Sequence, residues 1–209
     1  MPAWQRVGVT LLALALLLSR AAPAQATYIE RNTIVTCGAG NDGSLQLAGA
    51  AAVSVTYSFP RNGSTTAQLA TGVGHPNSTS WNGTYTAQVN VTAVSIGAND
   101  TIDVSLIRLN SSCVLQETIA ADVASQSQPL AVQVFTFNFT SVGWAGPVAC
   151  ADLFGIQITF SDVVGLATNT ATVEYNVSPN DTVATPITEG AGCAAAATPP
   201  LRSLMGVGR

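Results

Sequence analysis

Residues 84–95 read T-Y-T-A-Q-V-N-V-T-A-V-S, and apolar and polar side chains alternate from Thr84 to Ala93. A period of two places successive side chains on opposite faces of an extended chain, so this stretch predicts a β-strand with one buried and one solvated face. The inward positions are Tyr85, Ala87, Val89, Val91 and Ala93.

The same alternation recurs along the chain, with turn clusters rich in Gly, Asn, Asp and Ser between the runs. After Leu106 the phase shifts to Ile107 and Leu109, which predicts a β-bulge near Leu106. The inward residues of the other runs are Val53, Val55, Tyr57, Phe59, Ile102, Val104, Leu106, Phe135, Phe137, Phe139, Phe154, Ile156, Ile158, Phe160, Ala171, Val173, Tyr175 and Val177.

Nine or ten half-polar strands without a competing helical period predict an all-β fold. Two antiparallel sheets packed face to face bury such strands best, so residues 27–190 are expected to form an antiparallel β-sandwich of jelly-roll type. Residues 27–37 can be an ordinary first strand or an arm that pairs with a neighbouring molecule, and the ordinary strand is favoured.

The first 26 residues have the pattern of a cleaved signal helix. Arg6 precedes an apolar run over residues 7–18, and Ala24, Gln25 and Ala26 form an A-x-A cleavage pattern. The run is shorter than the roughly 20 residues of a membrane span. Residues 191–209 contain prolines and arginines and are interpreted as a flexible tail. We therefore expect a secreted or extracellular protein with no membrane span.

Charge is sparse and negative. The chain has no lysine, and removal of the leader leaves five arginines against eleven acidic residues. This balance argues against nucleic acid as a partner. The abundance of apolar residues likewise excludes intrinsic disorder.

All four cysteines follow the predicted leader. In an oxidising compartment an even set predicts two disulfides, and the sequence does not choose among the three pairings. Their spacing is unlike that of a zinc site. The four are Cys37, Cys113, Cys150 and Cys193.

Acceptor triplets for N-glycosylation are unusually frequent. Nine of the twelve asparagines open an N-x-S/T triplet, where composition alone predicts about two. A preference of Asn and Thr for exposed turns and strand faces explains part of the excess. The alternative to a glycosylated protein is therefore a bacterial Thr-rich β protein that carries no sugar. The predicted acceptors are Asn62, Asn77, Asn82, Asn90, Asn99, Asn110, Asn138, Asn176 and Asn180.

No catalytic set emerges from the sequence. The single histidine, His75, lies in a predicted loop without a G-x-S-x-G motif. The acids that could serve a glycosidase do not fall at even spacing on one strand. Asn41-Asp42-Gly43 and Asn180-Asp181 are considered for a structural calcium ion, but neither matches the D-x-[DN]-x-[DN]-G loop, and plain turns are the favoured interpretation. We expect no enzyme, metal or cofactor; the acids considered are Asp100, Asp103, Glu117, Asp152, Asp162 and Glu174.

Two tryptophans follow the leader, and both lie next to glycine in predicted loops. Trp81 and Trp144 could stack on sugar rings as a glycan-binding platform. The other interpretation, which is favoured, is that they cap the ends of the core.

Three stretches carry a resemblance: W-N-G-T-Y-T-A-Q-V-N-V-T-A from Trp81, I-D-V-S-L-I-R-L-N-S-S-C-V-L-Q-E-T from Ile102 and V-Q-V-F-T-F-N-F from Val132. They resemble β-sandwich modules of virion, appendage and other surface structural proteins. The resemblance covers under half of the chain after the leader and implies an assembly module without a catalytic residue. The dense acceptor triplets and cysteines depart from what a cytoplasmic phage particle protein needs.

Together these patterns predict a secreted, disulfide-stabilised, N-glycosylated structural protein: a coat, matrix or filament subunit that associates with itself or with other surface proteins. A carbohydrate-binding or adhesive module is the alternative function, with glycans as partners. A glycosidase ranks third.

Overall fold

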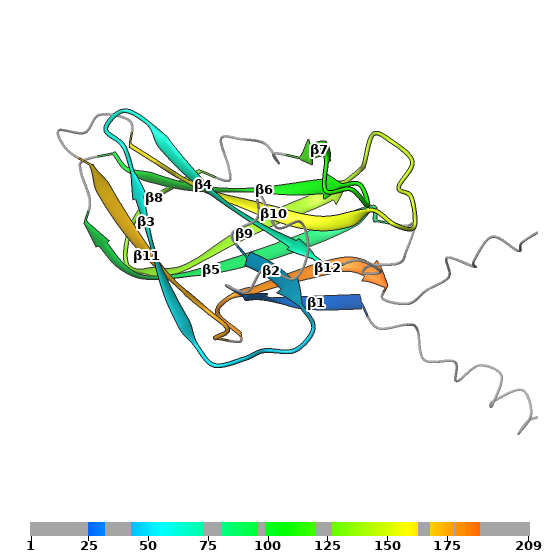
Figure 1. Cartoon of the computed structure of the whole chain (residues 1–209), viewed down its shortest axis with the longest axis horizontal. Helices are drawn as coiled ribbons and strands as arrows, with labels where there is room; N and C mark the ends of the chain where they lie inside the picture. The colour runs from blue at the N-terminus through cyan, green and yellow to red at the C-terminus, as the bar shows by residue number, and fades with distance from the viewer. Residues whose placement is uncertain are drawn as a thin grey trace, which may run out of the picture.

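The computed structural model describes residues 25–31, 43–72, 81–95, 99–119, 127–162, 168–177 and 179–188. These residues contain strands and connections and no helix, which confirms the predicted all-β class (Figure 1). No apolar helix capable of crossing a membrane occurs in these ranges. The strands are β1 (Gln25–Arg31), β2 (Gly43–Gln46), β3 (Val53–Phe59), β4 (Ser64–Thr71), β5 (Gly83–Ser95), β6 (Thr101–Leu109), β7 (Leu115–Ile119), β8 (Gln128–Pro129), β9 (Gln133–Val142), β10 (Leu153–Ser161), β11 (Asn169–Tyr175) and β12 (Thr182–Thr188).

Strand β1 begins inside the predicted leader. The Ala26 side chain is buried, and its carbonyl accepts a hydrogen bond from Thr185 Oγ1 at 3.0 Å. A cut after Ala26 would therefore remove two residues of β1. The rest of the predicted leader and the predicted tail lie outside the described residues.

Hydrogen bonds join all twelve strands into one continuous sheet. The order is β3-β11-β5-β12-β1-β2-β4-β10-β6-β7, with β8 beside β6 and β9 beside β5. Each pair is antiparallel except β2 and β4, which run parallel. The prediction of purely antiparallel pairing is therefore wrong, because the short strand β2 pairs with β1 on one edge and with β4 on the other.

The sheet folds over, so that distant parts of its inner face pack against each other. The ring of Tyr85 on β5 stacks on that of Phe154 on β10 with centroids 5.4 Å apart, although four strands separate β5 from β10 in the hydrogen-bonded order. The ring of Tyr57 on β3 likewise stacks on that of Phe160 on β10, with centroids 5.5 Å apart. Rings so far apart in the sheet meet only if the sheet folds over, and their burial supplies much of the stability of the fold.

Most predicted inward positions are confirmed. Phe135, Phe137 and Phe139 on β9 are buried while the residues between them are exposed. The inward assignments of Val53 and Ala93 are wrong, because both side chains are exposed. The register of β5 with β11 shifts after Val91, and this shift reverses the alternation.

The bulge predicted near Leu106 does not interrupt the pairing of β6 with β10, but the register of β6 with β7 shifts between Arg108 and Leu109. β6 pairs with β10 in unbroken register from Thr101 to Leu109. Apolar residues occupy both faces at the end of β6 because Ile107 and Leu109 enter a second, smaller core. The other buried members of this core are Ala70 and Leu153.

Gly155 lies where three central strands leave no room for a side chain. A Cβ atom there would lie 2.5 Å from the backbone oxygen of Leu69 and 2.9 Å from Ile107 Cγ1. We expect Gly155→Ala to lower the free energy of unfolding by about 1–3 kcal/mol through overpacking, measured by urea denaturation. Gly143→Ala is the control, since a Cβ at Gly143 meets nothing within 4 Å, and an equal effect of both variants would contradict the packing described here.

Candidate functional site

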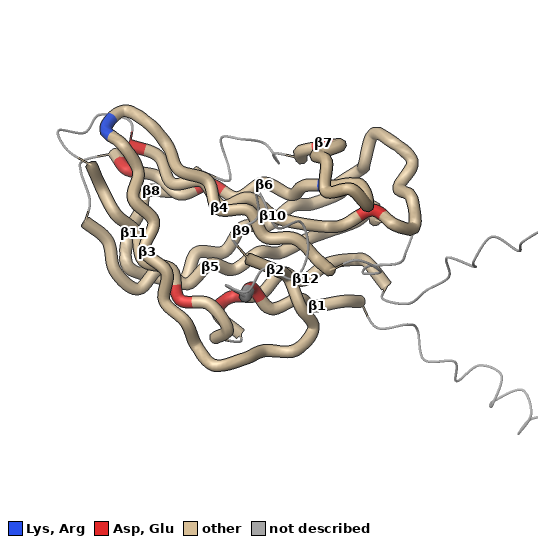
Figure 2. Tube along the Cα trace, viewed as in Figure 1, with Lys and Arg blue, Asp and Glu red and all other residues tan. Residues whose placement is uncertain are grey.

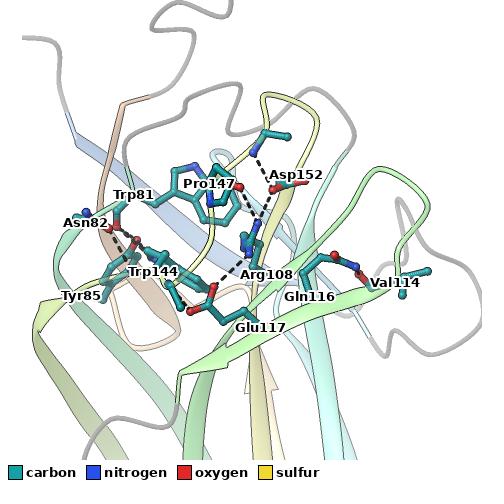
Figure 3. Close-up of polar contacts among 12 residues, drawn as sticks. Trp81, Asn82, Tyr85, Arg108, Val114, Gln116, Glu117, Trp144, Pro147 and Asp152 are labelled. Atoms are coloured by element: carbon teal, nitrogen blue, oxygen red, sulfur yellow. Dashed lines mark hydrogen bonds and ion pairs between the residues drawn. The ribbon is translucent and has the colours of Figure 1, made fainter.

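The densest polar cluster of the described residues surrounds the guanidinium of Arg108 on β6 (Figure 3). Nη1 donates to Asp152 Oδ2 at 3.0 Å and to the Pro147 carbonyl at 3.1 Å. Nη2 donates to Glu117 Oε2 on β7 at 3.2 Å. Because the Arg108 side chain is only 11% exposed, it contacts these groups with little water between them. We call these four residues the Arg108 network.

The two carboxylates of the Arg108 network also hold the connection between β9 and β10. Glu117 Oε1 accepts from the Ala145 backbone N–H at 2.7 Å, and Asp152 Oδ2 accepts from that of Ala149 at 2.9 Å. A buried cation with two fixed carboxylates and a carbonyl is paired and hydrogen-bonded as a structural site requires. Such an arrangement can fasten a loop to the sheet, and it leaves neither acid available as a general acid or nucleophile.

Beside the Arg108 network, both predicted loop tryptophans lie in the core (Figure 3). Trp81 is 1% exposed and Trp144 is 8% exposed, and their rings meet edge to face at 5.4 Å. Trp144 Nε1 donates to the Trp81 carbonyl at 3.2 Å and to the Tyr85 hydroxyl at 3.1 Å, and that hydroxyl donates to the same carbonyl. A sugar needs an open ring face, so the platform interpretation of Trp81 and Trp144 is corrected in favour of capping.

The other acids proposed for glycosidase chemistry are separately engaged. Asp100 accepts from Asn169 Nδ2 at 3.2 Å, and Asp162 accepts from the Asn62 backbone N–H at 3.2 Å. On β6, burial raises the pKa of Asp103. In the ranges described, no three His, Cys, Asp or Glu side chains gather to hold a metal ion. His75 lies outside the described residues.

Eight of the nine predicted glycan acceptors are described, and none of the eight is buried. Asn77 lies outside the described residues. Four side chains are exposed and four are half-buried, so the acceptors meet the first condition for carrying sugar, which is access to water. The exposed ones are Asn62, Asn82, Asn99 and Asn138, and the half-buried ones are Asn90, Asn110, Asn176 and Asn180.

The acceptor nitrogens differ in what they already bond. Asn90 Nδ2 donates to Glu174 Oε2 at 3.1 Å, and Asn176 Nδ2 donates to the Ala51 carbonyl at 3.0 Å. Asn82 instead uses its Oδ1, which accepts from the Trp144 backbone N–H at 3.1 Å. A glycan replaces one hydrogen of Nδ2, so it competes with the bonds of Asn90 and Asn176 and not with that of Asn82.

At some of these positions, the backbone conformation itself favours asparagine. Asn62, Asn99 and Asn176 have φ values of 51°, 87° and 69°, in the left-handed region that Asn tolerates better than most residues. Asn110 Oδ1 accepts from the N–H groups of Ser112 and Val114, as in an Asx turn. Turn chemistry therefore explains part of the asparagine excess.

Two of the four cysteines, Cys113 and Cys150, fall in the described residues, where both are disulfide-bonded. Cys113 also packs against the second core. Cys37 and Cys193 lie outside the described ranges.

Comparison with known proteins gives no family. No protein-family model and no curated protein matches the chain. Two crystal structures of a CocE/NonD family hydrolase from Staphylococcus aureus share part of the backbone course, with TM-scores of 0.41 and 0.37 and identities of 9% and 6%. The matches cover 78% and 79% of this chain and 36% of the hydrolase in each case. The chain thus spans about a third of the hydrolase, and likeness at this level carries no argument about activity.

Sequence reasoning gave Glu30 no role and placed Asp181 in a turn, but both acids are 0% exposed. Figure 2 shows acidic positions gathered where β1, β2 and β12 lie together. A signal for Glu30 was present, because it follows Ala26 and Tyr28 at inward positions of an alternating strand. Asp181 gave none, because N-D-T is an ordinary turn sequence.

Proposed function

We propose that this chain is an exported, N-glycosylated structural β protein that assembles with copies of itself or with other surface proteins. The observation that carries the proposal is the position of the acceptor asparagines: all eight described ones reach the surface, on strands and turns from several parts of the sheet. Catalysis gains no comparable support, because five of the six candidate acids already accept hydrogen bonds from other groups.

The proposal includes a sandwich architecture of jelly-roll type. Ring contacts between β5 and β10 and between β3 and β10 support two facing layers. The parallel strand β2 would be the crossing between them, since it joins β1 to β4. The resemblance of Trp81–Ala93 and the two later stretches to surface structural modules agrees with this architecture.

Self-association has a candidate surface along β9. Among the described strands, β9 pairs with β5 alone, so its other edge can take up a further strand beyond the Thr136 carbonyl, which accepts from Gln128 Nε2 at 3.1 Å. Val132, which precedes β9, and Val134, near its start, are 58% and 37% exposed. An edge with exposed valines suits pairing with the same edge of a second copy.

Glycan occupancy tests the exported, sugar-bearing part of the proposal. In protein secreted from a eukaryotic host, we expect Asn62 and Asn82 to be largely occupied. Asn90 and Asn176 should be occupied several-fold less, because a sugar on Nδ2 competes with the hydrogen bonds that this nitrogen donates. Glycopeptide mass spectrometry measures each site. Bare asparagine at Asn62 and Asn82 would contradict the proposal, and equal occupancy at all four would contradict the hydrogen-bond argument.

Association through β9 is tested by light scattering of the secreted protein over a concentration series. We expect the wild-type protein to form oligomers. Val134→Lys should raise their dissociation constant at least ten-fold, because the change places a charge at the strand edge. Leu47→Lys is the control, since Leu47 is 51% exposed and lies outside β9. A monomer at every concentration would rule out self-assembly, and equal weakening by both variants would place the contact elsewhere.

A further inference from the structure

Glu30 is a fully buried carboxylate for which the protein supplies no hydrogen bond. Ala26, Tyr28 and Glu30 are buried at alternate positions of β1, so the Glu30 side chain lies on the inward side of the strand. Neither Oε1 nor Oε2 has a partner. Native proteins rarely leave a buried charge in this condition, so a missing partner is the first explanation to test.

Two residues that are hydrogen-bonded to the Glu30 backbone also carry side-chain oxygens without partners. The Glu30 backbone N–H donates to the Asp181 carbonyl at 3.0 Å, and the Glu30 carbonyl accepts from the Asn176 N–H at 3.1 Å. The side-chain atoms Asp181 Oδ1 and Asn176 Oδ1 are buried and unbonded. Four of the six buried unbonded side-chain atoms in the described residues thus belong to three residues that are joined through their backbones.

The remaining contacts of these side chains orient them. Asp181 Oδ2 accepts from the Val177 N–H at 2.6 Å, which holds the carboxylate within the turn between β11 and β12. Asn176 Nδ2 donates to the Ala51 carbonyl, which leaves its oxygen as the unbonded end of the amide. All four unbonded atoms are acceptors, so bonds among them cannot satisfy them while both acids are ionised.

The electrostatics of Glu30 and Asp181 also indicate that a positive partner is missing. Burial raises the pKa of Glu30 well above its ordinary value, and the charge of Asp181 raises it further. Burial also raises the pKa of Asp181 to about 6, although N–H donors oppose the shift. Both ion pairs found among the described residues belong to Arg108, so neither of them involves Glu30 or Asp181.

We propose that Glu30, Asp181 and Asn176 bind a calcium ion that fastens the end of β1 to the turn between β11 and β12. Two carboxylates and an amide oxygen are hard oxygen ligands of the kind that calcium takes, and backbone carbonyls and water can complete its six to eight positions. Magnesium is disfavoured because it demands strict octahedral geometry. Zinc is disfavoured because nitrogen or sulfur ligands are missing from the set.

The test uses the full chain freed of metal with EDTA and then titrated with CaCl2 or MgCl2 at pH 7.5 and constant ionic strength. We expect isothermal titration calorimetry to show one calcium per chain, and saturating calcium to raise Tm by about 5–10 °C. Magnesium at the same concentration should give less than a third of that shift. No calcium binding up to 5 mM by the wild-type protein would overturn the proposal, whatever the variants do.

Two variants separate a calcium site from a buried acid that merely lacks a partner. Glu30→Gln should abolish the calcium-dependent shift and should not lower Tm in EDTA, because a neutral amide replaces a buried acid whose ionisation burial already disfavours. Asn176→Ala should weaken calcium binding at least ten-fold, and it provides the test if Glu30→Gln does not fold. Asp103→Asn is the control, a half-buried acid on β6 at which calcium binding should be unchanged. Calcium shifts of full size in both site variants would overturn the assignment.

Discussion

Replacing Phe154 by alanine is expected to lower the free energy of unfolding by about 3–5 kcal/mol, measured by urea denaturation at equilibrium. Phe154 is 0% exposed. The centroid of its ring lies 6.0 Å from that of Tyr28, 5.4 Å from that of Tyr85 and 6.0 Å from that of Trp81. Truncation removes these contacts and leaves a cavity that the rigid strands around it cannot close.

The same experiment on Leu115→Ala provides the comparison. Leu115 is 47% exposed on β7, so its loss should change stability by no more than about 0.5 kcal/mol. Equal effects of the two substitutions would mean that the inner face of the sheet does not fold over onto Phe154.

The second large effect is expected at Arg108. Arg108→Met should lower the free energy of unfolding by about 3–5 kcal/mol, because it leaves the Glu117 and Asp152 carboxylates without their cation. The connection between β9 and β10 should loosen as well, since both carboxylates bind its backbone. Hydrogen exchange at Ala145 and Ala149 should accelerate at least ten-fold.

Two controls define that result. Arg61→Met alters an exposed arginine and should be neutral within about 0.5 kcal/mol. A triple variant, Arg108→Met with Glu117→Leu and Asp152→Leu, should recover most of the loss, because it removes the stranded acids together with the cation. A neutral Arg108→Met would show that the network contributes nothing to stability.

The strands could be predicted because alternation is a local property of the sequence. Phe135, Phe137 and Phe139 reveal an inward face to anyone who reads every second residue. The sheet order could not be predicted, because it depends on β2, whose four residues G-S-L-Q carry no periodic signal. The parallel pairing of β2 with β4 was invisible for the same reason.

The site was less accessible to sequence reasoning. A tryptophan next to glycine in a loop has the same local sequence whether its ring faces solvent or the core, and burial distinguishes the two for Trp81 and Trp144. The two carboxylate partners of Arg108, Glu117 and Asp152, lie 9 and 44 residues further along the chain, so only the fold brings them together. Glu30 could have been suspected as an acid at an inward strand position.

The most direct test of the account is the intact mass of the protein recovered from its native source, before and after enzymatic removal of N-glycans. We predict a chain without its leader whose mass falls on treatment by the equivalent of several glycans, with acceptors such as Asn62 and Asn82 converted to aspartate. An unprocessed chain whose mass is that of the bare polypeptide and does not change on treatment would contradict the account.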